Sequence, residues 1–354
     1  MPTPRFRMPA EWAPHAASWL AWPHKEASWP GRLELIPPIF AAMARELATG
    51  EDVHINVCDT ATEAEAVEHL RRAGADLARI KLHQVPTNDA WIRDHGPMFV
   101  NGDEGQAILD WGYNAWGGKY PPFDLDDVVP QRVGELLGLP VLQPGMILEG
   151  GSIDLDGEGT LLTTEACLLN PNRNPQLDRA AIERNLCHWL GAERVLWLGD
   201  GLLGDDTDGH VDDLTRFVAP GVVVTAVEDR RSDENYETLQ ANLARLRVMR
   251  DTRGRGLEIH TLPMPDPVEV EGERLPASYA NFYIGNAVVL LPGFHCPQDA
   301  VAARTLAALF PARRIVQMDC RDLVWGLGAF HCLTMQQPLP CTDRSPNRPL
   351  MFSK

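Results

Sequence analysis

The sequence predicts an α/β fold built from repeated units. Four times along the chain, a hairpin signal is followed by a helical stretch and then by an apolar strand. The four expected turns recur at intervals of 55 to 65 residues, at Asn101-Gly102, Asp156-Gly157, Pro220-Gly221 and Gly285-Asn286. No low-complexity tract or long Gly/Ser linker divides the 354 residues, so we expect one domain over residues 1–354.

Each unit has its own helix and closing strand. Helical spacing of apolar residues predicts helices at 126–138, 176–190, 235–250 and 297–309. Short apolar runs predict the strands that follow, at 140–143, 194–199, 257–263 and 313–319. The first 85 residues supply a fifth helix-and-strand unit, in which residues 17–23 form a strand able to close a ring. A two-layer α/β protein without symmetry would give the same signals, so both arrangements stay open.

Composition favours a globular protein with a small partner. The chain is 44% hydrophobic and 23% charged, and its net charge of −17 offers no basic face for nucleic acid. A cationic substrate suits this charge, although an acidic surface also serves solubility alone.

Neither a membrane segment nor a disulfide framework is expected. The sequence has no run of about 18 apolar residues. The first residues lack the apolar core of a signal peptide, which indicates a cytoplasmic protein. Seven cysteines without a Cys-x-x-Cys pair suit free thiols rather than a structural zinc site. The oligomeric state stays open, and a homo-oligomer is allowed.

Three carboxylates stand at matching places in the repeat. Asp94, Glu149 and Asp212 each lie eight residues before the expected turn of their unit. Because strand side chains alternate with a period of two, we expect all three at the same end and face of equivalent strands. Converging carboxylates repel one another unless something positive joins them, such as a metal ion or a cationic substrate. The fourth unit has Ala277 at this offset and supplies no acid.

A histidine and a cysteine complete the candidate site. His210 stands two residues before Asp212, so we expect it on the same strand face as a proton carrier. Cys332 follows Gly326 and Gly328, which allow close backbone approach, and is either a nucleophile or a buried thiol. The adjacent His331 is expected to point to the opposite strand face and away from the chemistry.

With these residues, the chain resembles the agmatine deiminase family of guanidino-group-modifying enzymes with the pentein fold. The matching segments follow the family order over nearly the whole chain: MPAEWAPHAASWLAWPH (8–24), NDAWIRDHGP (88–97), DWGYNAWGGKYPPFD (110–124), LEGGSID (148–154), LLTTEACLLNPNRNP (161–175), DDTDGHVDDLTRF (205–217), ASYANFYIGN (277–286) and FHCLTMQQP (330–338). The resemblance implies a five-bladed α/β propeller, with ββαβ units around a pseudo-fivefold axis.

The resemblance also implies roles for individual residues. Cys332 would be the nucleophile, His210 the general acid and base, and Glu149 the carboxylate that orients or charges the imidazole. Asp94 and Asp212 would hold the guanidinium, and Asp206 would contact the substrate away from the reacting carbon. Agmatine would yield N-carbamoylputrescine and ammonia through an amidino-cysteine intermediate, in putrescine biosynthesis, without a metal or organic cofactor.

The substrate itself stays open at this stage. The family's Asn-Ile-His-Cys run is replaced here by GLGAFHC (326–332), so deimination of peptidyl-arginine or another guanidino compound is an alternative. Trp91, with Trp111 and Trp116, is a candidate for the pocket entrance. Arg93 and Arg173 are the arginines to consider for binding an α-carboxylate.

Two rival functions remain. Asp208-x-His210-x-Asp212 and residues 152–156 (SIDLD) resemble the carboxylate motifs of a metal-dependent ureohydrolase, but in reverse order. An inactive polyamine-binding protein on the same scaffold is the other.

Overall fold

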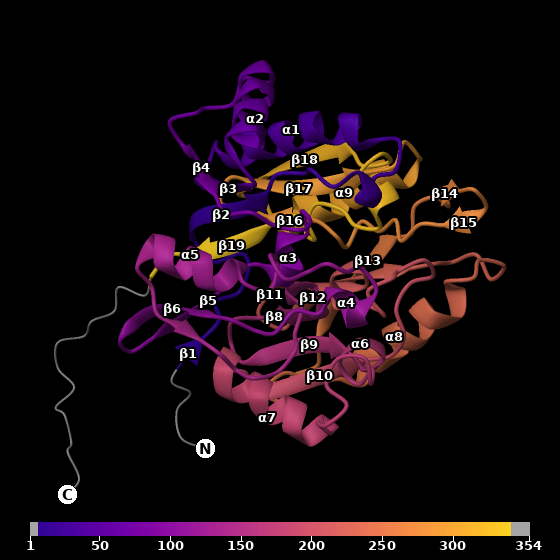
Figure 1. Cartoon of the computed structure of the whole chain (residues 1–354). Helices are drawn as coiled ribbons and strands as arrows, with labels where there is room; N and C mark the ends of the chain where they lie inside the picture. The colour runs from indigo at the N-terminus through magenta and orange to yellow at the C-terminus, as the bar shows by residue number, and fades with distance from the viewer. Residues whose placement is uncertain (1–5, 341–354) are drawn as a thin grey trace, which may run out of the picture.

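The computed structural model, shown in Figure 1, describes residues 6–340. Within these residues, five of the six sheets share one strand pattern, and the sixth is the two-stranded sheet of β14 (Glu269–Val270) and β15 (Glu273–Arg274). In each of these five sheets two strands pair antiparallel, as a hairpin in four of them, and a helix then leads to a third strand parallel to the second. The predicted repeat of hairpin, helix and strand is therefore confirmed, with a fifth copy shared between the two ends of the chain.

Four units are continuous in sequence and match the predicted helices and strands to within a few residues. They consist of β5 (Met98–Gly102), β6 (Gly105–Leu109), α5 (Val129–Leu137) and β7 (Val141–Leu142); β8 (Ile153–Leu155), β9 (Thr160–Thr164), α7 (Arg179–Leu190) and β10 (Arg194–Leu198); β11 (Thr215–Ala219), β12 (Val222–Val227), α8 (Tyr236–Val248) and β13 (Glu258–Pro263); and β16 (Tyr283–Ile284), β17 (Val288–Gly293), α9 (Gln298–Leu309) and β18 (Arg314–Asp319).

The fifth unit joins the two ends of the chain. Its antiparallel pair joins β19, near the C-terminus, to β2, near the N-terminus, so the strand predicted at 17–23 does close a sheet. The unit consists of β19 (Met335–Pro338), β2 (His15–Ala21), α1 (Ile36–Leu47), β3 (Asp52–Val57), α2 (Thr60–Ala73) and β4 (Ile80–Gln84).

Short elements fill the connections between these units. They are β1 (Phe6–Arg7), η1 (Glu26–Ser28), η2 (Leu33–Leu35), α3 (Ile92–His95), α4 (Ala115–Gly118), η3 (Gly150–Ser152), α6 (Glu165–Leu168), η4 (Val211–Asp213), β14 (Glu269–Val270), β15 (Glu273–Arg274) and η5 (Val324–Gly326). Several of them carry the candidate site, because they lie directly before the first strand of a unit.

Local sequence signals explain where elements begin and end. In α7 the Asp178 side chain accepts a hydrogen bond from the Ala181 N–H, and Gly191 ends the helix with φ of 72°, a conformation that glycine adopts without steric cost. The first hairpin turn lies at residues 103–104 and not at Asn101-Gly102 as predicted. Gly105, with φ of 122°, begins the return strand, so it and not Gly102 is the glycine that the turn requires.

The main helices lie outside the sheets and pack on them through buried apolar side chains. Helices α1, α2, α7 and α8 lie at the periphery in Figure 1, and the strands lie between them. Trp19 is fully buried and packs near His54 and Phe99, so it joins the sheet of β2 to that of β5. Among residues 6–340, no helix has both the length and the apolar character that crossing a bilayer requires.

Candidate active site

The predicted carboxylates lie at the same point of three units, in a single helical turn before the first strand. Asp94 is in α3, Glu149 immediately precedes η3, and Asp212 is in η4. The expectation that they and His210 lie on strands was therefore wrong. The equal offset still brought them together, because each of these turns leads into the first strand of its hairpin. Cys332 holds a similar place in the turn before β19.

Gly151 shows how tightly these groups converge. A Cβ atom on Gly151 would lie 2.6 Å from His210 Nδ1 and 2.9 Å from both Asp94 Oδ1 and Asp212 Oδ2. Asp94 from the unit before and His210 and Asp212 from the unit after therefore surround Gly151. The backbone N–H of Gly151 donates a 2.9 Å hydrogen bond to Asp94 Oδ1. Any side chain here would occupy the space that the three groups share.

The Cys332 thiol is buried among carboxylates. Its Sγ lies 3.7 Å from Asp212 Oδ2 and accepts a 3.1 Å hydrogen bond from Asn281 Nδ2. Burial, followed by the negative charges of Asp212, Asp213 and Asp94, raises the pKa of Cys332 well above the usual value for a thiol. In the protein without substrate, this electrostatic environment favours the protonated thiol.

Asn281, in the fourth unit, is a site residue that sequence reasoning missed. Its Oδ1 accepts from the backbone N–H groups of His331 (3.0 Å) and Cys332 (3.3 Å). Its Nδ2 donates to Asp213 Oδ1 at 3.0 Å as well as to the Cys332 sulfur. The fourth unit thus contributes an amide that fixes the turn carrying Cys332. The available signal was an asparagine four residues before the predicted turn at Gly285-Asn286.

His210 is fully buried beside Asp94. Its Nδ1 lies 3.7 Å from Asp94 Oδ1, and neither ring nitrogen has a hydrogen-bond partner. Burial opposes a charge on the ring, but Asp94 and then the Cys167 thiol raise the pKa of His210 well above its usual value. This shift favours the protonated imidazole, the form that a general acid requires.

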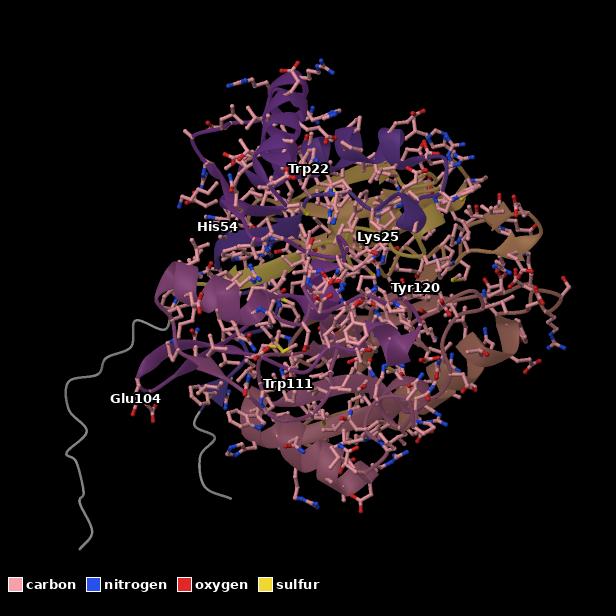
Figure 2. All side chains as sticks on the ribbon, in the orientation of Figure 1. Trp22, Lys25, His54, Glu104, Trp111 and Tyr120 are labelled. Carbon is pink, nitrogen blue, oxygen red and sulfur yellow. The ribbon has the colours of Figure 1, made fainter. Side chains whose placement is uncertain are left out.

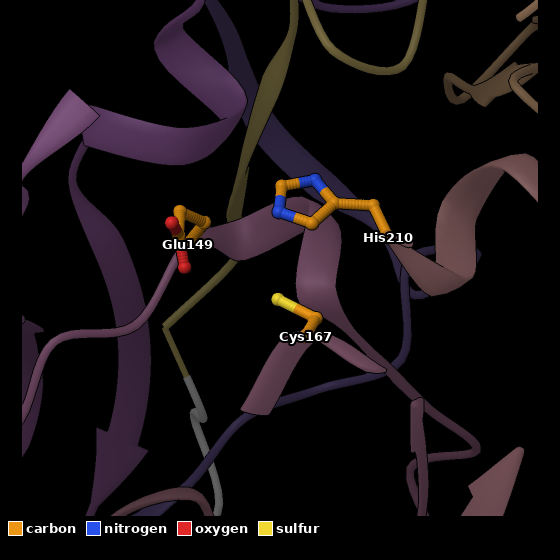
Figure 3. A group of neighbouring side chains, drawn as sticks. All are labelled: Glu149, Cys167 and His210. Atoms are coloured by element: carbon orange, nitrogen blue, oxygen red, sulfur yellow. The ribbon is translucent and has the colours of Figure 1, made fainter. Parts of the chain in front are cut away.

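Glu149 lies on another side of the imidazole. Its Oε1 accepts a 2.7 Å hydrogen bond from Arg173 Nε, and its Oε2 has no partner. Donor atoms of Glu149, His210 and Cys167 all lie within 4.8 Å of one another, and the three side chains face a common space (Figure 3). Cys167, assigned from sequence to ordinary packing, is therefore a neighbour of His210.

His331 corrects another expectation. Residues 330–333 form a turn, so His331 and Cys332 do not alternate as neighbours on a strand do. The His331 Nδ1 lies 2.7 Å from Asp212 Oδ2, and its Nε2 lies 2.7 Å from Glu11 Oε2. The His331 ring therefore lies between two buried carboxylates, one at each ring nitrogen. Despite burial, His331 keeps the pKa of Asp212 below its usual value.

A pocket of about 250 Å³ leads to the thiol. Its lining includes Trp91, Asp94, Trp116, Asp206 and Cys332, which places the predicted Trp91 and Asp206 at the same cavity as the candidate nucleophile. Trp116 Nε1 donates a 2.9 Å hydrogen bond to Asp94 Oδ2. The close approach predicted at the glycines is present, because a Cβ on Gly328 would lie 3.2 Å from Cys332 Cβ.

The pocket mouth carries charges that are already paired. Lys25 and Tyr120, labelled in Figure 2, both line the pocket. The Lys25 ammonium lies 3.2 Å from Asp89, and the Tyr120 hydroxyl donates to Asp206. Trp111, also labelled, lies in a core cluster instead and does not line this pocket.

The candidate arginines are both engaged elsewhere. Arg93 donates to His331 O at 3.2 Å and to Gln336 Oε1 at 2.8 Å, and Arg173 is held by Glu149 and Asp208. Neither lines the pocket. An α-carboxylate therefore finds neither of these guanidinium groups along the pocket wall.

The carboxylates of the ureohydrolase alternative do not converge. Asp154 Oδ2 accepts from Arg216 Nε at 2.8 Å, and Asp156 Oδ1 accepts two backbone N–H groups of its hairpin turn. Asp208 is held by Arg173 and Asn172. Across residues 6–340, the one set of three or more side chains spaced to share a metal ion is instead Glu149, Cys167 and His210.

Known proteins match the chain over almost its whole length. Residues 7–338 match the model of the Porphyromonas-type peptidyl-arginine deiminase family. An agmatine deiminase of Pseudomonas aeruginosa is 41% identical over 96% of this chain and 98% of its own. The structure of an Enterococcus faecalis agmatine deiminase superposes with a TM-score of 0.87 at 35% identity, covering 94% of this chain and 96% of its own. An amidinotransferase of Microseira wollei shares the fold at a TM-score of 0.50 and 11% identity, and the match covers 93% of this chain and 96% of the amidinotransferase.

The matched family and relatives place the chain among the guanidino-modifying enzymes of the pentein class. The chain belongs to the Porphyromonas-type peptidyl-arginine deiminase family, and the curated relatives that it matches at about 40% identity are agmatine deiminases. The resemblance drawn from the sequence motifs is thereby confirmed.

The protonated thiol gives a first prediction. Only the thiolate reacts with iodoacetamide, and its fraction falls about tenfold for each pH unit below the pKa. Alkylation of Cys332 should therefore be slow at pH 7 and keep rising above pH 9.0, the ordinary thiol value. Asp212→Asn removes a negative charge and should move the profile to lower pH, as measured by peptide mass spectrometry.

Cys58 in the same digest is an internal control. Burial acts against its ionisation, but the neighbouring His24 lowers the pKa of this half-buried thiol, so its profile should lie below that of Cys332. A Cys332 profile at or below that of Cys58 would contradict the electrostatic description of the site.

Proposed function

We propose that the protein hydrolyses agmatine to N-carbamoylputrescine and ammonia through a covalent intermediate on Cys332. The observation that carries this proposal is the thiol at a pocket whose inner groups are carboxylates. Cys332 and Asp94 both line the pocket, and Asp212 Oδ2 lies 3.7 Å from the sulfur. Such a site matches a planar cation that is rich in N–H donors.

Asp94 and Asp212 would hold the guanidinium. Trp116 and the Gly151 N–H fix Asp94, and His331 fixes Asp212, so both carboxylates are oriented before substrate arrives. Asp212 Oδ1 is buried and has no hydrogen-bond partner, which leaves it free to accept from the substrate. Orienting the guanidinium carbon against the sulfur lowers the entropic part of the barrier.

The outer pocket favours agmatine over arginine. Asp206 and Asp89 face this region, and Lys25, the basic residue of the lining, lies 3.2 Å from Asp89. A cationic tail would share Asp206 and Asp89 with their present partners, Lys119 and Lys25, whereas an α-carboxylate would find no free guanidinium along the lining. We assign Asp206 to contact with the tail and Trp91 to the apolar wall along the methylene chain.

Substrate binding would trigger ionisation of the nucleophile. In the free protein the carboxylates keep the Cys332 thiol protonated. The bound guanidinium offsets their charge, so the thiol loses its proton to solvent and the sulfur attacks the guanidinium carbon. The neutral tetrahedral adduct then takes a proton from the His210 imidazolium, and ammonia leaves. An amidino-cysteine cation and a neutral imidazole remain.

The second half uses the same imidazole as a base. His210 takes a proton from water, whose oxygen attacks the carbon of the amidino-cysteine. The adduct collapses to the carbamoyl product, and the sulfur leaves as a thiol by taking the hydroxyl proton. His210 ends protonated, as it began. Glu149, fixed by Arg173 and near the ring, would stabilise the imidazolium in both halves.

We also propose that the five similar sheets form a five-bladed propeller. Five sheets of one strand pattern, each with a turn before its first strand, support an arrangement as five blades around a pseudo-fivefold axis. The fifth blade contains both chain ends, which supports one catalytic domain rather than two.

Product analysis tests the activity. Purified protein with agmatine should release ammonia and N-carbamoylputrescine, with unchanged turnover after extensive chelation. L-Arginine and benzoyl-arginine should be much poorer substrates, because each carries a group that the outer pocket does not pair. Cys332→Ser should reduce turnover to below about one thousandth of wild type while agmatine still binds. Urea and putrescine as products would overturn the proposal.

Gly151→Ala tests the convergence of the site. The new Cβ would lie 2.6 Å from His210 Nδ1, so the imidazole or the carboxylates must shift. Misplacement of about 1 Å costs about 100-fold in rate, and we expect at least this loss in kcat/KM with agmatine.

Gly256→Ala is the matched control for the glycine substitution. Its Cβ would meet only the flexible end of Arg250, at 3.6 Å, so turnover should stay within about twofold of wild type. Equal activity of the two variants, at equal thermal stability, would show that the space around Gly151 is not needed.

A further inference from the structure

We propose that Glu149, Cys167 and His210 form a binding site for one zinc ion, which inhibits the enzyme by occupying the His210 imidazole. This site is separate from the Cys332 thiol. It uses a cysteine that the deimination chemistry does not require.

The three side chains come from different segments but face the same space (Figure 3). One donor atom from each lies within 4.8 Å of the other two, and all three residues are buried. A tetrahedral zinc ion with bonds of 2.0 to 2.3 Å holds its ligands about 3.5 Å apart. Small side-chain rotations toward the common centre would therefore complete the coordination.

Unsatisfied polar atoms point to a ligand in this space. Glu149 Oε2 and both ring nitrogens of His210 are buried and have no hydrogen-bond partner. A buried polar atom without a partner costs about 1 to 3 kcal/mol, and such atoms are rare in folded proteins. A zinc ion would satisfy two of these atoms, Glu149 Oε2 and one ring nitrogen of His210, and the imidazole would release a proton as it binds.

The backbone fixes the two softer ligands relative to each other. Thr164 Oγ1 accepts from the Cys167 N–H at 3.2 Å and donates to Gly209 O at 2.6 Å. This hydroxyl joins α6, which carries Cys167, to the residue before His210. Arg173 holds the other oxygen of Glu149, so that carboxylate is also oriented. The site is thus built from side chains with restrained positions.

The donor set favours zinc over hard cations. Thiolate and imidazole are preferred by zinc, whereas magnesium and calcium require an almost complete oxygen shell. A thiolate and a carboxylate also balance the two positive charges of the ion. The fourth position would be open to water, as in sites with three protein ligands.

Occupation would stop proton transfer at His210. An imidazole nitrogen bonded to zinc cannot donate a proton to ammonia or accept one from water. This consequence rests on the proposed function, whereas binding of the ion does not. The test therefore measures binding first and turnover second.

Cobalt(II) is the probe, because a thiolate ligand gives it a near-ultraviolet charge-transfer band and zinc displaces it. The titration uses full-length Cys332→Ser protein, so that the nucleophile cannot contribute a sulfur. We expect one Co²⁺ per chain, a sulfur-to-cobalt band, and loss of that band on adding one equivalent of Zn²⁺. No band in this protein would overturn the proposal.

Three further variants in the same background locate the site. Cys167→Ser and Cys167→Ala should each lose the band and weaken Co²⁺ binding more than about tenfold, because even partners of metal ligands contribute about 10- to 100-fold. Cys187→Ser, at a half-buried thiol in α7, should keep both. Circular dichroism checks that each variant is folded. Two different substitutions of Cys167 are used so that the test still stands if one of the variants misfolds. A band that survives in a folded Cys167 variant would overturn the proposal.

Turnover is then measured with otherwise native protein. Micromolar Zn²⁺ should inhibit agmatine turnover reversibly, and Cys167→Ser should shift the half-inhibitory concentration upward more than about tenfold. Unchanged zinc sensitivity would contradict inhibition through this site. If the protein bound Co²⁺ as expected but had no activity on agmatine, the proposed function would fail and the metal site would stand.

Discussion

The structure depends on keeping a group of buried carboxylates charged. His331 bridges Asp212 and Glu11, each at 2.7 Å, and Arg216 joins Glu11 to Asp154. Each unpaired buried ion would cost several kcal/mol, so Arg216 and the His331 ring are needed as partners wherever the acids are kept. Burial opposes ionisation of Glu11, but Arg216 and His331 bring its pKa well below the usual value. One charge network thereby links the beginning, middle and end of the chain.

Around Asp94 and Cys332 the negative charges are not fully offset by positive ones. The proposed chemistry depends on this excess of negative charge. Burial and the neighbouring acids Asp212 and Glu149 raise the pKa of Asp94 even though His210 lies beside it. The same field keeps the Cys332 thiol protonated. In the proposed mechanism, a cation in the pocket would supply the missing charge, so the thiol would ionise when the correct substrate is present. Selectivity for a guanidinium and activation of the thiol then have one electrostatic cause.

Repetition made much of the fold and part of the site predictable from sequence. Equal offsets identified Asp94, Glu149 and Asp212, and turn signals located the helices between them. Their helical turns were missed because three or four residues carry no periodicity. Asn281 was missed because its unit has no acid at the shared offset, and His331 was misjudged because its turn resembles a strand start. The approach of Cys167 to His210 depends on Thr164 and Gly209, a tertiary contact without a local signal.

The central claim is that Cys332 forms a covalent bond with the guanidino carbon. Rapid acid quench of protein during steady turnover of agmatine, followed by peptide mass spectrometry, tests it directly. The account predicts a fraction of the Cys332 peptide heavier by the mass of agmatine less ammonia, absent when substrate is omitted. It also predicts that His210→Ala, which lacks the proton carrier, does not accumulate more of this species than wild type. An unmodified Cys332 in protein that is turning over would contradict the account.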